Sequence, residues 1–183
     1  SLRFTQADLM GTGVKVDAAY TWRHGAGDAA TEKGSSGDVG SGNQDGKSIT
    51  ITGAVPFIDG LTAGAGVAQL NTGTAYIKYS TGPVSIGYQK GAVAVNGTTK
   101  ANYINEYIGI SYKINDSLSV SYNDIESTKS THTVPVTQEW DSVSLSYTMG
   151  GMTIGIVDQS VDNATYTSGR KQDETAVQMT VAF

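Results

Sequence analysis

The sequence predicts an all-β protein, a transmembrane antiparallel β-barrel with about ten to eleven strands in residues 1–183, which form one domain. Three observations predict it. Apolar and polar side chains alternate along most of the chain with the two-residue period of a strand. Short and long connections tend to alternate. The chain also has 38% hydrophobic and 16% charged residues, and this hydrophobic fraction is low for a soluble protein that must bury a core.

The first half of the chain contains four separate alternating segments. In SLRFT, residues 1–5, Leu2 and Phe4 alternate with Arg3. Residues 14–22, 48–55 and 61–70 follow, each with apolar side chains on one face and mainly Thr, Ser, Gly or Ala on the other. This pattern is typical of strands whose two faces meet different surroundings.

The second half of the chain is predicted to form hairpins. Residues 75–90, 107–124 and 142–157 each contain two alternating runs joined by a turn sequence. The chain ends with ETAVQMTVAF, residues 174–183, in which Val177, Met179, Val181 and Phe183 share one face. No segment has a convincing helical period, so we expect no helices.

The connections are sorted by length. Short turns are expected at PFIDG, STGP, NDS and GG, whereas long loops are expected at residues 24–47, 91–102, 124–139 and 159–172; the tight turn at 71–73 is the exception. Short turns at one end and long loops at the other are typical of outer-membrane barrels, with the short turns in the periplasm. A Greek-key sandwich gives no reason for such sorting.

The two faces of the predicted strands also differ from those of a soluble sheet. The polar face carries mainly Ser, Thr, Gly, Asn and Gln, whereas the solvent face of a soluble sheet usually carries many Lys and Glu. Aromatic residues fall near the strand ends of the apolar face, where the two interfacial girdles of a barrel would lie. They are Tyr20 and Trp22 toward the long loops, and Tyr79, Tyr112 and Tyr147 toward the short turns.

Charge and motif content disfavour several other classes. The formal net charge is −5 and no run of Lys or Arg occurs, so nucleic acid is not an expected partner. The chain has no Cys and therefore no disulfide or thiolate metal site. His24 and His132 fall in predicted long loops, and no GxSxG elbow accompanies them. We therefore expect no enzyme and no catalytic residues.

These residues resemble the Gram-negative general porins, particularly those of the alphaproteobacterial type. The resemblance rests on the terminal TAVQMTVAF strand and on hairpins such as VSLSYTMGGMTIGIV, and its pattern covers nearly the whole chain. It implies a homotrimer in the bacterial outer membrane that lets ions and small hydrophilic solutes diffuse passively. It also implies that the barrel assembly machinery reads a signal formed here by Phe183, Val181 and Met179, in contact with outer-membrane lipid.

The resemblance implies sixteen strands, and the chain is too short to form them. A sixteen-stranded barrel with about 18 residues per strand and connection needs about 290 residues. Because SLRFT precedes a short connection, it looks like the end of a strand whose beginning is missing. We therefore expect the chain to be the C-terminal portion of a porin, without the constriction loop that follows the fifth strand. A complete ten-stranded barrel is the alternative.

Charged residues of the polar face are the candidate pore-lining residues. Alternation assigns Arg3, Lys15, Asp17, Lys78, Lys90 and Lys113 to this face, and Arg23 shares their parity at the loop mouth. Each alone could be a solvated surface charge. Together they form a mainly basic wall, and a channel of this kind selects by size and field. The resemblance singles out Arg3, because the family has a basic cluster on its wall.

Three alternatives remain open at this stage. Asp28, Asp38 and Asp45 could bind calcium in a loop, although their spacing does not match an EF-hand; we expect no other cofactor or metal. A small ten-stranded barrel enzyme could use His132 and acidic loop residues at its rim. A soluble or fibrous all-β adhesin could pack the apolar face against another sheet, which the sorted loops and the uncharged polar face disfavour.

Overall fold

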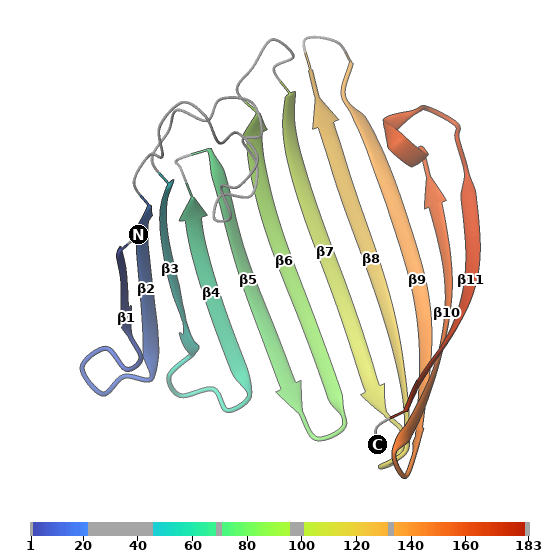
Figure 1. Cartoon of the computed structure of the whole chain (residues 1–183), viewed down its shortest axis with the longest axis horizontal. Coiled ribbons are helices and arrows are strands. Elements are labelled where there is room, and N and C mark those ends of the chain that lie inside the picture. Colours follow the sequence, from blue (N-terminus) through green and yellow to red (C-terminus); the bar gives the residue numbers. More distant parts are fainter. Residues whose placement is uncertain (1, 22–45, 69–70, 96–100, 132–133, 182–183) are drawn as a thin grey trace.

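The computed structural model describes residues 2–21, 46–68, 71–95, 101–131 and 134–181. These residues form eleven antiparallel strands in one sheet, and the order of the strands in the sheet is their order in the chain (Figure 1). The prediction of an all-β fold is confirmed. The helical element of the described residues is a single 3₁₀ turn, and none of their helices is long and apolar enough to cross a membrane.

The strands lengthen from the amino-terminal to the carboxy-terminal half. Their bounds are β1 Leu2–Gln6, β2 Val14–Thr21, β3 Gly46–Ala54, β4 Leu61–Ala68, β5 Thr72–Thr81, β6 Val84–Val95, β7 Ala101–Lys113, β8 Leu118–Ser130, β9 Val136–Met149, β10 Met152–Asp162 and β11 Gln172–Val181, and the 3₁₀ turn η1 is Ala164–Tyr166.

The register places the alternating residues of neighbouring strands on two distinct faces. Ile110 of β7 lies opposite Ile86 of β6 and Tyr122 of β8. The next residue, Ser111, lies opposite Ser85 and Ser121. We call the surface that carries Ile110 the apolar face and the surface that carries Ser111 the polar face.

The sheet is a single layer without a hydrophobic core. Among the described residues, the buried hydrophobic side chains are Ala101 and Ala164, whereas Ile108 is 48% and Leu145 40% exposed on the apolar face. A soluble sheet would cover such a face with a second layer. Backbone hydrogen bonds between strands hold this sheet together, and the apolar face stays largely exposed among the described residues.

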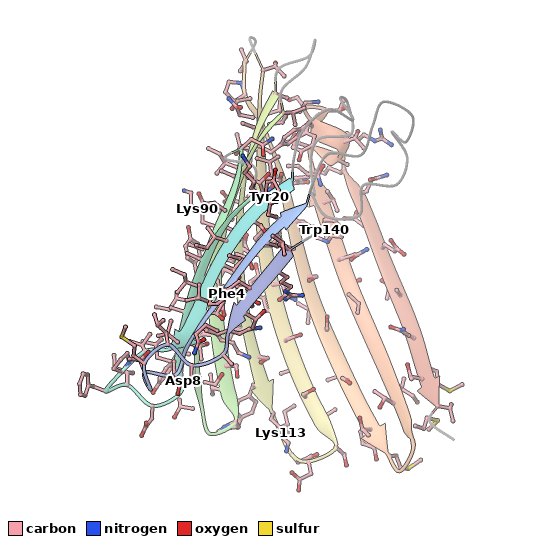
Figure 2. All side chains as sticks on the ribbon, turned by 60° about the vertical axis from the view of Figure 1, so that its left-hand side comes forward. Phe4, Asp8, Tyr20, Lys90, Lys113 and Trp140 are labelled. Atoms are coloured by element: carbon pink, nitrogen blue, oxygen red, sulfur yellow. The ribbon has the colours of Figure 1, made fainter. Side chains whose placement is uncertain are left out.

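The sheet curves into an open trough, which Figure 2 shows from one side. Phe4 and Lys90 lie on its outer side in this view. Strands β1 and β11 form the two edges and do not pair with each other. The eleven described strands therefore form a curved wall rather than a closed barrel.

Two of the predicted long loops are shorter than expected. Strand β6 continues to Val95 and β7 begins at Ala101, so most of the expected loop 91–102 is strand. Likewise, β8 continues to Ser130 and β9 begins at Val136, within the expected loop 124–139. The alternation of hydrophobicity ends before these strands do. Near the loops β8 and β9 carry mainly polar side chains on both faces, whereas β6 carries Gly, Ala and Val on both.

We predict that Gly60→Ala destabilises the sheet far more than Gly82→Ala. Both glycines have positive φ, +79° and +52°, so each alanine costs about 1–2 kcal/mol of backbone strain. A Cβ on Gly60 would also lie 2.0 Å from the backbone oxygen of Ser80, whereas nothing lies within 4 Å of one on Gly82. We expect the clash to add about 1–3 kcal/mol. Equal urea midpoints for the two variants would contradict this packing.

Candidate functional site: the polar face of the sheet

The amino-terminal end of the polar face carries an ion cluster. The Arg3 Nη2 lies 3.3 Å from Asp17 Oδ1 and the Lys15 Nζ 2.8 Å from Asp17 Oδ2. The Thr5 hydroxyl also donates to Asp17 Oδ1 at 2.5 Å. Two cations therefore share one carboxylate, and the cluster keeps one net positive charge. The sequence predicted all three charged residues on this face, and the register of β1 and β2 places them there.

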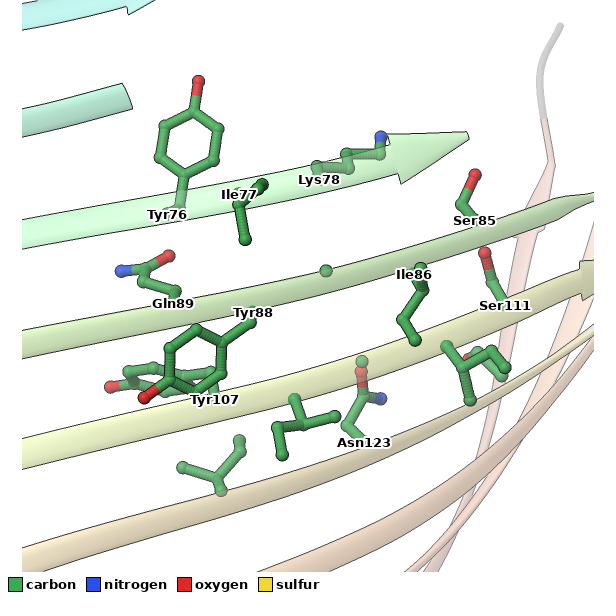
Figure 3. A pocket seen from close by; sticks show the side chains of 16 residues that line it. Tyr76, Ile77, Lys78, Ser85, Ile86, Tyr88, Gln89, Tyr107, Ser111 and Asn123 are labelled. Atoms are coloured by element: carbon green, nitrogen blue, oxygen red, sulfur yellow. The ribbon is translucent and has the colours of Figure 1, made fainter. Parts of the chain in front are cut away.

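The centre of the polar face is hollowed over two glycines. Gly87 of β6 lies directly opposite Gly109 of β7, so neither strand contributes a side chain at this point. The resulting hollow of about 390 Å³ is bordered by Lys78, Tyr107 and Asn123, among others (Figure 3). Among the described residues, no side chain forms an ion pair with the ammonium group of Lys78. This cation is therefore free to interact with a solute.

Lys113 marks the short-turn end of the polar face. Its Nζ donates to Asp116 Oδ1 at 2.8 Å across the turn that joins β7 and β8. This hydrogen bond and the lysine charge hold the pKa of the Asp116 carboxyl below its usual range. The pair is solvent-exposed, so it shapes the local field more than it stabilises the fold.

The assignment of Lys90 to the polar face is wrong. Lys90 lies opposite Ala75 and Glu106 and shares its face with Tyr88 and Ile86, an even number of residues away. Its Nζ donates to Glu106 Oε1 at 2.6 Å, and the Tyr88 hydroxyl donates to Glu106 Oε2 at 2.9 Å. Lys90 therefore belongs to a hydrogen-bonded group on the apolar face.

The apolar face ends in carboxylates toward the long loops. Asp124 lies opposite Asp141, and Glu126 lies opposite Glu139. The Tyr122 hydroxyl donates to Asp141 Oδ1 at 2.5 Å. Such like-charged neighbours are unfavourable, and water and salt must screen them. Extending the two-residue period beyond the apolar residues of β8 and β9 would have revealed this acidic margin from the sequence.

The apolar band between the two margins has a definite height. On β7, Tyr112 lies toward the short turns and Glu106 toward the long loops, on the same face. At about 3.3 Å per residue they are about 20 Å apart along the strand, close to the ~25 Å band of outer-membrane barrels. Tyr79 and Tyr147 lie near the same margin as Tyr112, toward the short turns, where the sequence predicted a girdle of aromatic residues.

The segment 163–171 folds against the polar face, which the sequence did not predict. Asn163 donates through Nδ2 to the carbonyl of Thr137 at 2.8 Å and accepts through Oδ1 from the Gly169 N–H at 2.8 Å. The Thr165 N–H donates to Gln138 Oε1 at 2.9 Å, and the Tyr166 and Ser127 hydroxyls are 2.7 Å apart. These contacts attach the segment to β8 and β9.

An aromatic and cationic contact reinforces this attachment. The rings of Tyr103 and Tyr166 meet edge to face with centroids 5.6 Å apart. The Lys129 Nζ lies 5.9 Å and 5.5 Å from their respective centroids. Asn163, Thr165 and Tyr166 all have positive φ, which is rare for residues with a Cβ and costs energy that these contacts must offset.

The remaining predicted sites are placed in part. Met179 and Val181 lie on the apolar face opposite Ile154 and Met152. Phe183, Arg23, His24, His132, Asp28, Asp38 and Asp45 lie outside the described residues. Within the described residues, no three His, Asp or Glu side chains are grouped so that they could hold a metal ion.

Comparison with protein families and with curated proteins identifies no relative. No family model matches the sequence, and no curated protein is significantly similar to it. The functional argument therefore rests on the geometry of the sheet.

We predict that Asn163→Ala loosens the segment 163–171. The variant loses both side-chain hydrogen bonds and the residue type that best tolerates positive φ, so we expect opening of the segment to increase about tenfold. Trypsin cleavage after Arg170 and Lys171 measures the opening. Asn123→Ala, which removes an amide from β8, is the matched control. Equal cleavage rates in the two variants would show that Asn163 does not fix the segment.

Proposed function

We propose that this chain forms the wall of an outer-membrane porin, a water-filled channel through which ions and small hydrophilic solutes diffuse passively. One observation carries the proposal: a single curved layer of strands has an exposed apolar band on one face and a polar, mainly basic surface on the other. Lipid outside and water inside satisfy both faces at once.

The apolar face supports contact with lipid. Its band consists of Ile, Val, Leu and Tyr side chains that are largely 40–50% exposed in the isolated sheet. Tyr79, Tyr112 and Tyr147 lie at one margin and carboxylates at the other, as expected where a bilayer gives way to water. In the bilayer both free edges, β1 and β11, must be paired, because lipid cannot satisfy open backbone groups.

The polar face supports a water-filled lumen. Its many Ser, Thr and Gly residues leave space open above the sheet, and no described residue packs over the hollow at Gly87 and Gly109. Arg3, Lys15, Lys78, Lys113 and Lys129 outnumber the carboxylates at this face, which are Asp17, Glu174 and, in the turn beside Lys113, Asp116. Such a wall favours anions by its field and involves no bond making.

The quaternary and assembly aspects of the proposal follow from the resemblance. We propose a homotrimer that is inserted by the barrel assembly machinery through a signal at Met179, Val181 and Phe183. The first two side chains share the apolar face with the band, so they would be accessible from the membrane side.

Leu145→Arg should oppose insertion, whereas Ser144→Arg should be tolerated. These neighbours on β9 point to opposite faces, and Leu145 lies between Tyr147 and Asp141 on the band. An arginine facing lipid near the midplane costs about 2–4 kcal/mol, whereas one in a wet lumen costs little. The measurement is the urea dependence of folding into lipid vesicles. A similar cost for both variants would contradict the assignment of the two faces.

Neutralising Lys78 should shift ion selectivity, whereas neutralising Lys90 should not. We expect Lys78→Gln to lower the preference for anions, because this unpaired cation faces the lumen, and Lys90→Gln to leave the preference unchanged, because Lys90 lies on the apolar face. Reversal potentials in planar bilayers should be measured at low salt, since the Debye length is only about 10 Å at 0.1 M. A wild-type protein that inserts into the bilayer as a closed barrel and does not conduct would refute the porin proposal itself.

A further inference from the structure

A second cavity lies on the polar face beneath the attached segment 163–171. It has a volume of about 350 Å³ and is lined by Gln138, Trp140, Gln159, Val161, Ala164, Thr165, Gln172, Asp173 and Glu174. This volume falls within the range of small-molecule sites. Strands β9, β10 and β11 form its floor, and η1 forms one wall.

The register brings an aromatic ring and hydrogen-bonding groups together in this cavity. Trp140 lies opposite Val161, which in turn lies opposite Gln172. In the adjacent row, Gln159 lies opposite Glu174, and its Nε2 donates to Glu174 Oε2 at 3.0 Å. Trp140, labelled in Figure 2, is half-buried in the isolated sheet. An indole and a hydrogen-bonded amide and carboxylate thus line the same cavity.

The wall formed by η1 is fixed rather than incidental. Ala164 is 1% exposed, and Gln138, at the floor, accepts from the Thr165 N–H. The Tyr166 hydroxyl contacts Ser127 on the other side of η1. These contacts fix one wall of the cavity, and a preformed wall reduces the entropy lost on binding.

Further aromatic residues extend from this cavity along the polar face. Tyr76, Gln89, Tyr107, Ile125 and Trp140 occupy consecutive strands of one row, each opposite the next. With strands about 4.8 Å apart, Tyr76, Tyr107 and Trp140 are spaced at roughly 10 Å. Aromatic rings at such intervals provide successive stacking surfaces for an elongated solute.

We propose that this cavity is a binding site for a neutral sugar, which rests on the channel function proposed above. A sugar ring offers C–H groups on its faces and hydroxyls around its rim. The indole of Trp140 can stack against the C–H groups on the face of the sugar ring. The amide of Gln159 and the carboxylate of Glu174 can form hydrogen bonds with its hydroxyls. Asp173 and Glu174 in the lining disfavour an anion.

The chain offers a direct reporter for this site. It contains two tryptophans, Trp22 and Trp140, so in the full-length Trp22→Phe variant all tryptophan emission comes from the proposed site. Titration of the detergent-solubilised protein with maltose should give a saturable change in emission. Adding Gln159→Ala should raise the dissociation constant about fivefold, the effect of one lost hydrogen bond, whereas adding Ser121→Ala should not change it. Ser121 shares the polar face but lies outside the cavity.

Two results would overturn the site. One is a tryptophan emission that does not change saturably with maltose, or a dissociation constant for maltose that is the same in the Gln159→Ala and Ser121→Ala variants. The other is a saturable response to calcium chloride or sodium gluconate in place of maltose, which would indicate a cation or anion site.

A second measurement separates this inference from the channel proposal. In planar bilayers, maltose should reduce the ionic current of the wild-type chain saturably, and Trp140→Ala should abolish this reduction while the channel still conducts. A conducting wild-type channel that maltose does not affect refutes the sugar site alone. A saturable fluorescence response from a protein that inserts into the bilayer as a closed barrel and never conducts refutes the channel and leaves the site standing.

Discussion

The structure depends on the backbone ladder, because a single-layered sheet has no core to hold its strands in place. The ladder fixes the register, and the register decides which side of the wall each residue faces. A slip of one residue between β7 and β8 would turn Ser121 toward the apolar band and Tyr122 toward the polar face. The apolar band, the hollow over the glycines and the aromatic row all exist because eleven strands keep one consistent parity.

Local alternation made much of the wall predictable. The faces of Ile110, Leu145, Lys78 and Asp17 follow from the two-residue period, and the register agrees. The assignment of Lys90 failed although the same period, counted from Tyr88, gives the right answer. The ends of β8 and β9 were missed for a physical reason: beyond the apolar band both faces are polar, so hydrophobicity no longer reports the strand.

The candidate sugar site could not be predicted in the same way. Its floor follows from the parity of Trp140 and Gln159, but its wall depends on contacts between distant parts of the chain. Ser127 and Tyr166, for example, are 39 residues apart in sequence and meet through their hydroxyls. Three contacts to β8 and β9, made by Asn163, Thr165 and Tyr166, hold a backbone that local preferences disfavour. A sequence period carries no information about them.

The order of the strands has a consequence for how the wall is built. Each strand pairs with its neighbours in the chain, so every step of assembly except the pairing of β2 with β3 closes a short loop, and the contact order is low for a β protein. The sheet can therefore grow hairpin by hairpin from any point, and an incomplete wall exposes the same kind of edge as a longer one. In the proposed channel, closing the wall at its two free edges would be the one event that involves strands outside neighbouring pairs. The slow and error-prone step of assembly is then the last one, and a template that holds an edge strand would act there.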